Sequence, residues 1–226
     1  MTDAPDVAAP PQPLAYTLWA VLRRNPARPT GGDDLAPALA AVAASGVTVR
    51  GFYDVSSFRA DADLMIWLHG PAPERLQAAL RMLRRAAPLD SLLPTWNVLG
   101  VHREAEFNAG HTPSFLRGAP PERWITVYPF VRSYDWYLLP ADERRDMLAD
   151  HGRKGATHRS VLSNTVATFG ISDYEWVLAL EAPELVDLVD LMRHLRETEA
   201  RRHVREETPF FAGRRIEVGE IAEVLA

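Results

Sequence analysis

The sequence contains no cysteine at any of its 226 positions. Disulfides, thiolate metal ligands, a cysteine nucleophile and thioether-linked haem are therefore excluded. The sequence also has no apolar run that approaches the roughly 20 residues of a membrane-spanning helix. Because 47% of the residues are apolar, a chain of this length can still bury a sizeable core. We therefore expect a globular protein of the cytoplasm without a membrane span.

The sequence has fewer basic than acidic residues, with 25 Lys and Arg against 30 Asp and Glu. The net charge of −5 at pH 7 predicts no nucleic-acid partner. Lys154 is the only lysine, so nearly all of the basic residues are arginine. A GC-rich genome is the simplest explanation of this bias, but arginine also binds carboxylates through two parallel hydrogen bonds. The sequence further lacks a glycine-rich phosphate loop, a serine elbow, a zinc-ligand spacing and an acidic calcium loop.

The order of apolar patterns along the chain indicates two similar halves. Residues 1–13 are rich in Ala, Pro and Asp, and we expect them to form a disordered tail. The segment lacks the basic and apolar regions of a signal peptide, so it is not expected to be one. Period-two and helical patterns then alternate. They predict strands at 16–22, 47–55, 62–68, 95–101, 124–130, 161–169, 174–180 and 210–218, and helices at about 35–45, 73–86, 140–151 and 183–202.

Each half reads β-α-β-β-α-β, which is the ferredoxin-like unit. We expect an α+β fold with one half at 14–110 and a second, ligand-binding half at 111–226. Two such sheets can pack face to face or join into one barrel wrapped by helices. The long connection at 103–123 contains His111 beside Gly110. This histidine is either a solvated loop residue or a base on a loop that closes over a pocket.

The predicted helix at 140–151 carries a second histidine of interest. His151 follows Met147 by four residues and Leu148 by three, so it lies on the apolar face of the helix. Gly152 is then expected to cap the helix. His151 is either a core residue or an imidazole that points into a cavity as a metal or haem ligand.

The segment 124–137 is unusually aromatic, and it contains Tyr128, Arg132 and Trp136. These residues are either core aromatics with a surface arginine or a pocket wall that offers a phenol, a guanidinium and an indole to an anionic aromatic ligand. Arg201 and Arg202 end the predicted helix 183–202, where they complement the helix dipole or bind an anion. Arg202 projects closer to the apolar stripe, so we expect it to be the one that reaches inward.

Four segments together carry a resemblance to a known family: WITVYPFVRSYDWYLLP, the helix ending in His151-Gly152, NTVATFGISDYEW and LRETEARRHVREETPFFAG. With these segments the chain resembles the chlorite dismutase-like haem proteins, and within them the actinobacterial coproheme decarboxylases. The resemblance covers nearly all of the chain after the tail. It implies a dimeric α+β barrel made of two ferredoxin-like halves, and assembly as a homopentamer.

The resemblance also implies a reaction. Hydrogen peroxide would drive the oxidative decarboxylation of two propionates of iron coproporphyrin III (coproheme), which gives haem b and carbon dioxide as the last step of coproporphyrin-dependent haem biosynthesis. The porphyrin would be both substrate and redox cofactor. A transient contact with ferrochelatase is a further expectation, while the partner that delivers the substrate stays open. Two other functions stay open: a haem peroxidase that oxidises small external donors, and a haem or porphyrin carrier without catalysis.

Residue roles follow from the matching motifs. The resemblance makes His151 the proximal ligand of the iron, Tyr128 the tyrosine that forms a radical, and His111 the distal histidine. The resemblance also implies that Arg132 contacts propionates near the tyrosine and that Trp136 lies near the second reactive propionate. One of Arg201 and Arg202 would bind a propionate.

One departure from the family pattern bears on the substrate. Chlorite dismutases carry a distal arginine on the strand that reads VLSNTVATF in this sequence, which has none. Ser163 or Asn164 stands nearest to the place of the glutamine found in Firmicute decarboxylases. The missing arginine argues against chlorite as the substrate.

Overall fold

The computed structural model describes residues 14–28, 31–32, 34–103 and 112–226. Its first half contains four strands and two helices in the order β-α-β-β-α-β. These elements are β1 (Tyr16–Arg23), α1 (Ala36–Ala44), β2 (Thr48–Asp54), β3 (Leu64–Gly70), α2 (Pro73–Leu83) and β4 (Leu93–Val101).

The second half repeats this order with small additions. Its main elements are β5 (Trp124–Arg132), α3 (Ala141–Gly155), β6 (Leu162–Ala167), β7 (Trp176–Ala182), α4 (Leu185–Leu195), the 3₁₀ helix Glu199–His203, β8 (Val204–Glu206), β9 (Phe211–Ile216) and the short α5 (Ile221–Val224). None of the helices within the described ranges is both long and apolar enough to cross a membrane.

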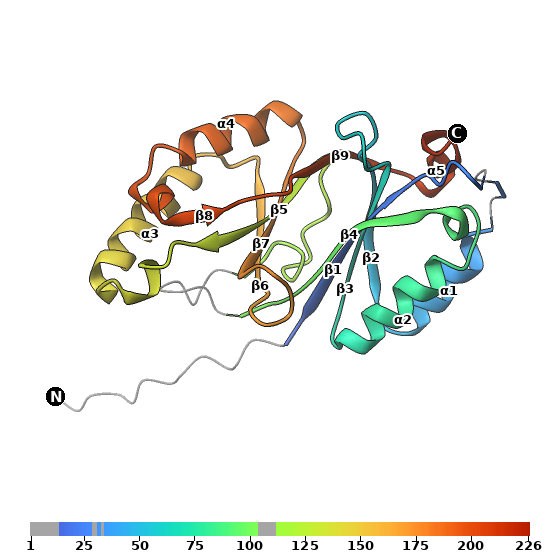
Figure 1. Ribbon diagram of the computed structural model, residues 1–226, viewed down its shortest axis with the longest axis horizontal. Helices are drawn as coiled ribbons and strands as arrows, with labels where there is room; N and C mark the ends of the chain where they lie inside the picture. The colour runs from blue at the N-terminus through green and yellow to red at the C-terminus, as the bar shows by residue number, and fades with distance from the viewer. Residues whose placement is uncertain (1–13, 29–30, 33, 104–111) are drawn as a thin grey trace.

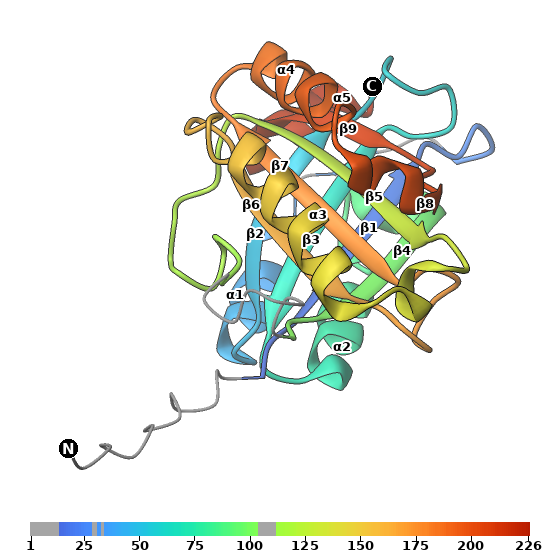
Figure 2. The same ribbon diagram turned by 90° about the vertical axis from the view of Figure 1, so that its left-hand side faces the viewer.

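The strands of both halves are hydrogen-bonded in the same spatial order. In the first half the order is β4-β1-β3-β2, and in the second it is β9-β5-β7-β6. β2 also pairs with β9, and β4 pairs with β6 through Val101 and Ala167. The two ferredoxin-like sheets are therefore joined at both edges and do not stack as separate layers, with α1 and α2 at one end of the molecule and α3 and α4 at the other (Figures 1 and 2). This arrangement confirms the predicted α+β class.

The position of the site follows from the alternation of side chains along β5. Ile125 and Val127 belong to a core cluster that also contains Trp19, Trp67 and Phe211. Because successive side chains of a strand point to opposite faces, the next residue leaves this cluster. Tyr128 packs instead with Leu188 and Leu191 of α4, on the face of the sheet that the second-half helices cover.

Two predicted helix ends are wrong. α3 continues through Gly152 to Gly155, and Gly152 has none of the positive φ that a glycine cap needs. α4 ends at Leu195, well before Arg202. The extended backbone of Thr198 (φ −102°, ψ 147°) interrupts the helix, and its hydroxyl donates a hydrogen bond to the Leu195 carbonyl oxygen (3.0 Å), which satisfies an acceptor of the last turn.

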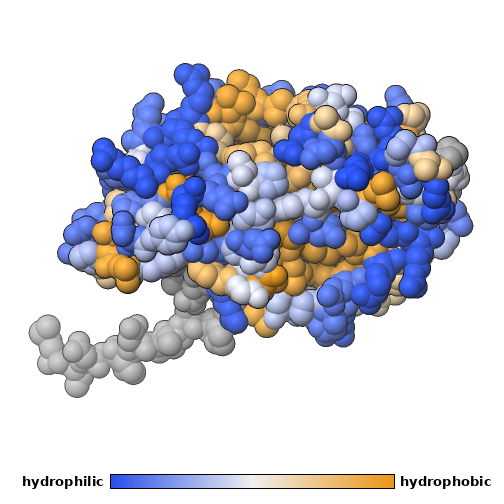
Figure 3. Space-filling view, viewed as in Figure 1, coloured by the Kyte–Doolittle hydropathy of each residue, from blue (hydrophilic) through white to orange (hydrophobic). Residues whose placement is uncertain are grey.

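The boundary predicted between residues 110 and 111 lies outside the described residues, as does the tail 1–13, and both stay predictions. On the face shown in Figure 3, polar side chains predominate, and an apolar patch lies over α4. Val186 and Val189 are exposed there. This helix therefore has one buried and one exposed apolar side, and its buried side closes the site described next.

Candidate functional site

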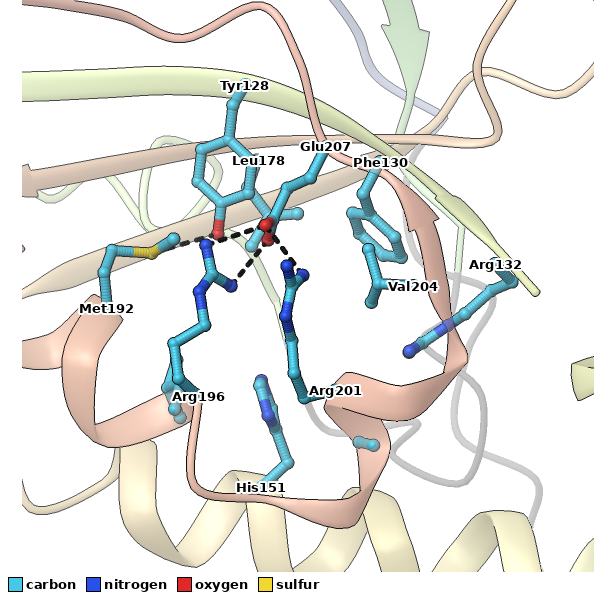
Figure 4. Close-up of a pocket in the computed structure, with 12 residues that line it drawn as sticks. Tyr128, Phe130, Arg132, His151, Leu178, Met192, Arg196, Arg201, Val204 and Glu207 are labelled. Carbon is cyan, nitrogen blue, oxygen red and sulfur yellow. Dashed lines mark hydrogen bonds and ion pairs between the residues drawn. The ribbon is translucent and has the colours of Figure 1, made fainter.

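A pocket lies between the second-half sheet and the helical segments that cover it (Figure 4). About 480 Å³ of space at this place is not filled by protein atoms, a volume that includes open solvent at the mouth of the pocket. Strands β5 and β7 supply one wall, and α3, α4 and the 3₁₀ helix supply the other. Its lining residues are Tyr128, Phe130, Arg132, His151, Leu178, Met192, Leu195, Arg196, Ala200, Arg201, Val204 and Glu207.

Four of the residues singled out from the sequence meet in this pocket: Tyr128, Arg132, His151 and Arg201. They come from β5, α3 and the 3₁₀ helix, which are distant in sequence. His111 lies outside the described residues.

Tyr128 is held in place from two sides. Its hydroxyl donates a hydrogen bond to Met192 Sδ (3.4 Å), and its ring stacks on Phe210 with 4.5 Å between ring centroids. Burial, and secondly the negative charge of Glu207, raise the pKa of the phenol far above its ordinary value. Tyr128 is therefore a neutral phenol with a fixed orientation at neutral pH.

Two arginines and one glutamate form a tight cluster beside Tyr128 (Figure 4). The two Nη atoms of Arg196 contact the two carboxylate oxygens of Glu207, at 3.0 Å from Oε1 and 2.7 Å from Oε2. Arg201 Nη1 lies 2.8 Å from Oε2 of the same carboxylate. The pocket therefore contains a site that binds a carboxylate through both of its oxygens. Arg196 and Glu207 were not identified from the sequence.

His151 projects from α3 toward this cluster (Figure 4). Its Nδ1 lies 3.4 Å from Thr198 Oγ1. Because the Thr198 hydroxyl donates its hydrogen to the Leu195 carbonyl, it can only accept from His151, which assigns the hydrogen to Nδ1 and leaves the Nε2 lone pair for a ligand. Burial, and secondly the charge of Arg132, lower the pKa of His151, so the imidazole is neutral at pH 7.

A single neutral imidazole suits a particular kind of metal. Within the described part of the chain, no three His, Cys, Asp or Glu side chains gather to hold a free metal ion. A single imidazole with one nitrogen available is suited to a metal whose other ligands arrive with it, as they do in a porphyrin.

Arg132 is supported by an aromatic ring from behind. Its guanidinium lies 4.2 Å from the centre of the Trp136 ring, a favourable cation–π distance. Trp136 itself is buried and is not among the residues that line the pocket. It begins the 3₁₀ turn Trp136–Leu138 that follows β5, and its ring also contacts His203, with 5.4 Å between ring centroids. The sequence predicts that the Trp136 indole forms part of the pocket wall. In the structure the indole instead contacts Arg132, which does line the pocket.

The expectation that Arg202 reaches inward is wrong. Its side chain is 78% exposed and pairs with Glu199 at 2.9 Å. α4 stops at Leu195, and the chain re-enters as a 3₁₀ helix with about three residues per turn. This change of geometry turns Arg201 into the pocket and Arg202 to the solvent.

Asn164 also lies away from the pocket. It is fully buried, accepts a hydrogen bond from the backbone N–H of Phe115 (3.0 Å) and donates to the Glu181 carboxylate (3.0 Å). Its amide is therefore used inside the core, and Ser163 is the other candidate on this strand.

Comparison with known proteins places these features in a family. The family model for chlorite dismutase matches residues 31–216. The coproheme decarboxylase of Mycolicibacterium smegmatis is 56% identical over 174 residues, which cover 76% of this chain and 75% of that protein. The coproheme decarboxylase of Staphylococcus saprophyticus is 23% identical over 66% of this chain and 67% of that protein.

A solved structure agrees on the fold. The chlorite dismutase of Candidatus Nitrospira defluvii in complex with imidazole superposes with a TM-score of 0.77, at 19% identity, over 93% of this chain and 94% of that one. The matched family model covers the first half from α1 onward, the second half through β9 and every described residue of the pocket. This chain belongs to the chlorite dismutase family.

Proposed function

We propose that the protein is a coproheme decarboxylase, which converts iron coproporphyrin III to haem b with hydrogen peroxide as the oxidant. The observation that carries this proposal is the meeting of three groups in one pocket. These are the buried neutral phenol of Tyr128, a carboxylate site made by Arg196 and Arg201, and the imidazole of His151 with its Nε2 atom available. The high identity to the M. smegmatis enzyme supports the same conclusion.

The residues present fit an iron porphyrin that carries several carboxylates. Phe130, Leu178 and Val204 offer apolar surface to a macrocycle. Arg132 adds a third guanidinium to those of Arg196 and Arg201. His151 would hold the iron, and the arginines would hold propionates, which four carboxylates on one ligand require.

The overall reaction sets what the pocket must do. Each of the two reacting propionates loses carbon dioxide, one proton and two electrons and becomes a vinyl group. In balance, one propionate, one hydrogen peroxide and one proton give one vinyl group, one carbon dioxide and two water molecules. When bound, the iron porphyrin supplies the reaction with peroxide from which the oxidising equivalents come.

Tyr128 links those equivalents to the propionate. Its phenol gives up the O–H hydrogen atom to the first of the two oxidising equivalents that peroxide supplies, and the resulting radical takes a hydrogen atom from the propionate side chain, which restores the phenol. The second oxidising equivalent takes one electron from the propionate radical, whose bond to the carboxylate breaks, so that carbon dioxide leaves and the vinyl group remains. Arg196 and Arg201 hold a carboxylate beside this ring, so the transfer occurs between positioned groups and not by diffusion. Stacking on Phe210 keeps the ring in one place through both reactions.

The test is a Tyr128→Phe variant. We expect it to bind coproheme but to release no carbon dioxide when peroxide is added, as followed by mass spectrometry of the porphyrin. Tyr134→Phe is the matched control, because Tyr134 is 77% exposed, and it should give haem b at the wild-type rate. Full conversion by Tyr128→Phe would reject the proposed role. Dye oxidation by the wild type without loss of carboxyl groups would indicate a peroxidase, and bleaching alone would indicate a carrier.

We assign the remaining predicted residues in the same proposal. His111 takes the proton of the peroxide, since an imidazole with a pKa near 6.5 accepts a proton at neutral pH. Trp136 acts through Arg132, whose guanidinium its ring supports. A His111→Ala variant should therefore bind coproheme normally and consume peroxide at least tenfold more slowly, in line with typical losses of a general base.

The proposal extends to the setting of the enzyme. It works as a homopentamer in the cytoplasm, as the family resemblance implies, and makes a transient contact with ferrochelatase. Sedimentation velocity of the purified chain tests the pentamer, and a monomer or dimer at micromolar concentration would reject it.

A further inference from the structure

The carboxylate that Arg196 and Arg201 bind in this structure belongs to the chain itself. Glu207 fills the arginine fork with the same chemical group that four propionates would bring. Arg196 uses both Nη atoms on this one carboxylate. A propionate that is to be held by the same fork must therefore replace Glu207.

The location of the cluster indicates which part of a ligand it serves. The Glu207 charge is close enough to Tyr128 to raise the pKa of the phenol, and Figure 4 shows the Tyr128 hydroxyl, which is bonded to Met192, next to the cluster of Glu207 with its two arginines. A carboxylate in the fork would thus lie next to the oxidisable ring. Under the proposed function, on which this inference rests, that is where a reacting propionate has to be.

Glu207 is also placed where it can move. It follows the end of β8 at Glu206 and precedes the start of β9 at Phe211, so its backbone is in a connection between strands. Its side chain is 14% exposed, whereas that of Arg196 is 37% exposed. Solvent therefore reaches the cluster, and rotation of the Glu207 side chain is enough to free the guanidiniums.

We propose that Arg196 is a further carboxylate-binding residue of the pocket, and that Glu207 is an internal stand-in that occupies the fork until a porphyrin propionate displaces it. Glu207 then weakens binding, because each ligand has to compete with it. If the paired state holds about nine-tenths of the ligand-free molecules, the apparent Kd is roughly tenfold above that of the open state.

The experiment measures binding of metal-free coproporphyrin III to the ligand-free full chain, through quenching of tryptophan fluorescence. Without iron and peroxide, neither ligation by His151 nor the reaction contributes to the signal. We expect Glu207→Gln to lower the Kd about three- to tenfold and Arg196→Gln to raise it. Glu206→Gln and Arg205→Gln are matched controls on exposed neighbours and should leave the Kd unchanged.

The double variant Arg196→Gln/Glu207→Gln distinguishes a Glu207 that competes with the ligand from a Glu207 that positions the arginines. In an Arg196→Gln background only Arg201 still pairs with Glu207, so adding Glu207→Gln should tighten binding by a smaller factor than it does in the wild type. Unchanged or weaker binding by Glu207→Gln alone would overturn the inference, since it would make Glu207 a fixed part that positions the arginines. Should Arg196→Gln fail to fold, Arg196→Lys keeps the charge but not the fork and is expected to bind more weakly than the wild type.

Failure of this inference can be distinguished from failure of the proposed function. Tighter binding by Glu207→Gln together with no loss of carboxyl groups from coproheme and peroxide would keep the stand-in and reject the decarboxylase. Normal decarboxylation together with weaker binding by Glu207→Gln would do the reverse.

Discussion

The hydroxyl of Thr198 lies 3.4 Å from Nδ1 of His151 and gives its own hydrogen to the Leu195 carbonyl. Thr198 is 5% exposed, so water does not readily take its place. The residue that ends the helical path of α4 therefore also determines which nitrogen of His151 faces the pocket.

Thr198→Val keeps the shape of this side chain and removes the acceptor. We expect the ligand-free variant to show a mixture of the two His151 tautomers in the ¹⁵N NMR spectrum of the ring, where the wild type shows the Nδ1–H form. Haem affinity should fall about 10- to 100-fold, as for other partners of metal ligands. Thr198→Ser should restore both properties, and Thr157→Val, at an exposed site, should change neither. A Thr198→Val variant that keeps only the Nδ1–H form would contradict the assignment.

Arg201 and Arg202 provide a direct comparison of neighbouring side chains. Arg201→Gln should weaken coproheme binding by roughly tenfold or more, about 1.4 kcal/mol per factor of ten, because it removes a guanidinium from the pocket. Arg202→Gln should bind like the wild type, since its side chain is in solvent. Equal losses in the two variants, measured by titration of coproheme, would contradict the orientation described above.

A buried ion pair is expected to dominate the stability of the join between the halves. Arg50 of β2 and Glu181 of β7 are 2.7 Å apart and almost completely buried, and Glu181 also accepts from the backbone of Glu122. Glu181→Leu leaves the guanidinium without its carboxylate, so the free energy of unfolding should fall by about 3–5 kcal/mol. Urea denaturation checks this value, and Arg50→Met in the same chain should recover part of the loss.

His69 is expected to make stability depend on pH. Burial, and secondly the charge of Arg50, lower the pKa of His69 to about 4 in the folded protein, against about 6.5 in the unfolded chain. Between these values the unfolded chain binds a proton and the folded chain does not, so the free energy of unfolding falls as the pH drops from 6.5 toward 4. In His69→Phe, urea denaturation at pH 7 and pH 5 should show a smaller difference than in the wild type. An equal difference would place the titration elsewhere.

The order of the elements could be read from the sequence because it depends on local periodicity. Alternation along β5 puts Tyr128 on the opposite face from Val127, and helical spacing puts His151 on the inner face of α3. Both side chains accordingly lie where the pattern predicts. Local patterns of this kind need no knowledge of which elements become neighbours.

The parts that could not be read depend on contacts between distant segments. Gly152 carries no sign that α3 continues past it, and the extended conformation of Thr198 is stabilised by packing around Leu195 and His151. Since the orientation of Arg201 and Arg202 follows from that break, an uninterrupted helix assigned the two side chains the wrong way round. Glu207 resembles its exposed neighbour Glu206 in sequence, and only the folded chain brings it to Arg196.

The pairing of β2 with β9 brings together residues of the first and the second half that are far apart in sequence, with Phe52 opposite Ile216. During synthesis, the first half leaves the ribosome with this edge of β2 unpaired, and an unpaired strand edge favours association with other chains. The sheet can close only after β9 has been made, so its last step joins segments that are far apart in sequence and is slow. The final strand of the chain thus sets when the nascent protein stops being prone to aggregation.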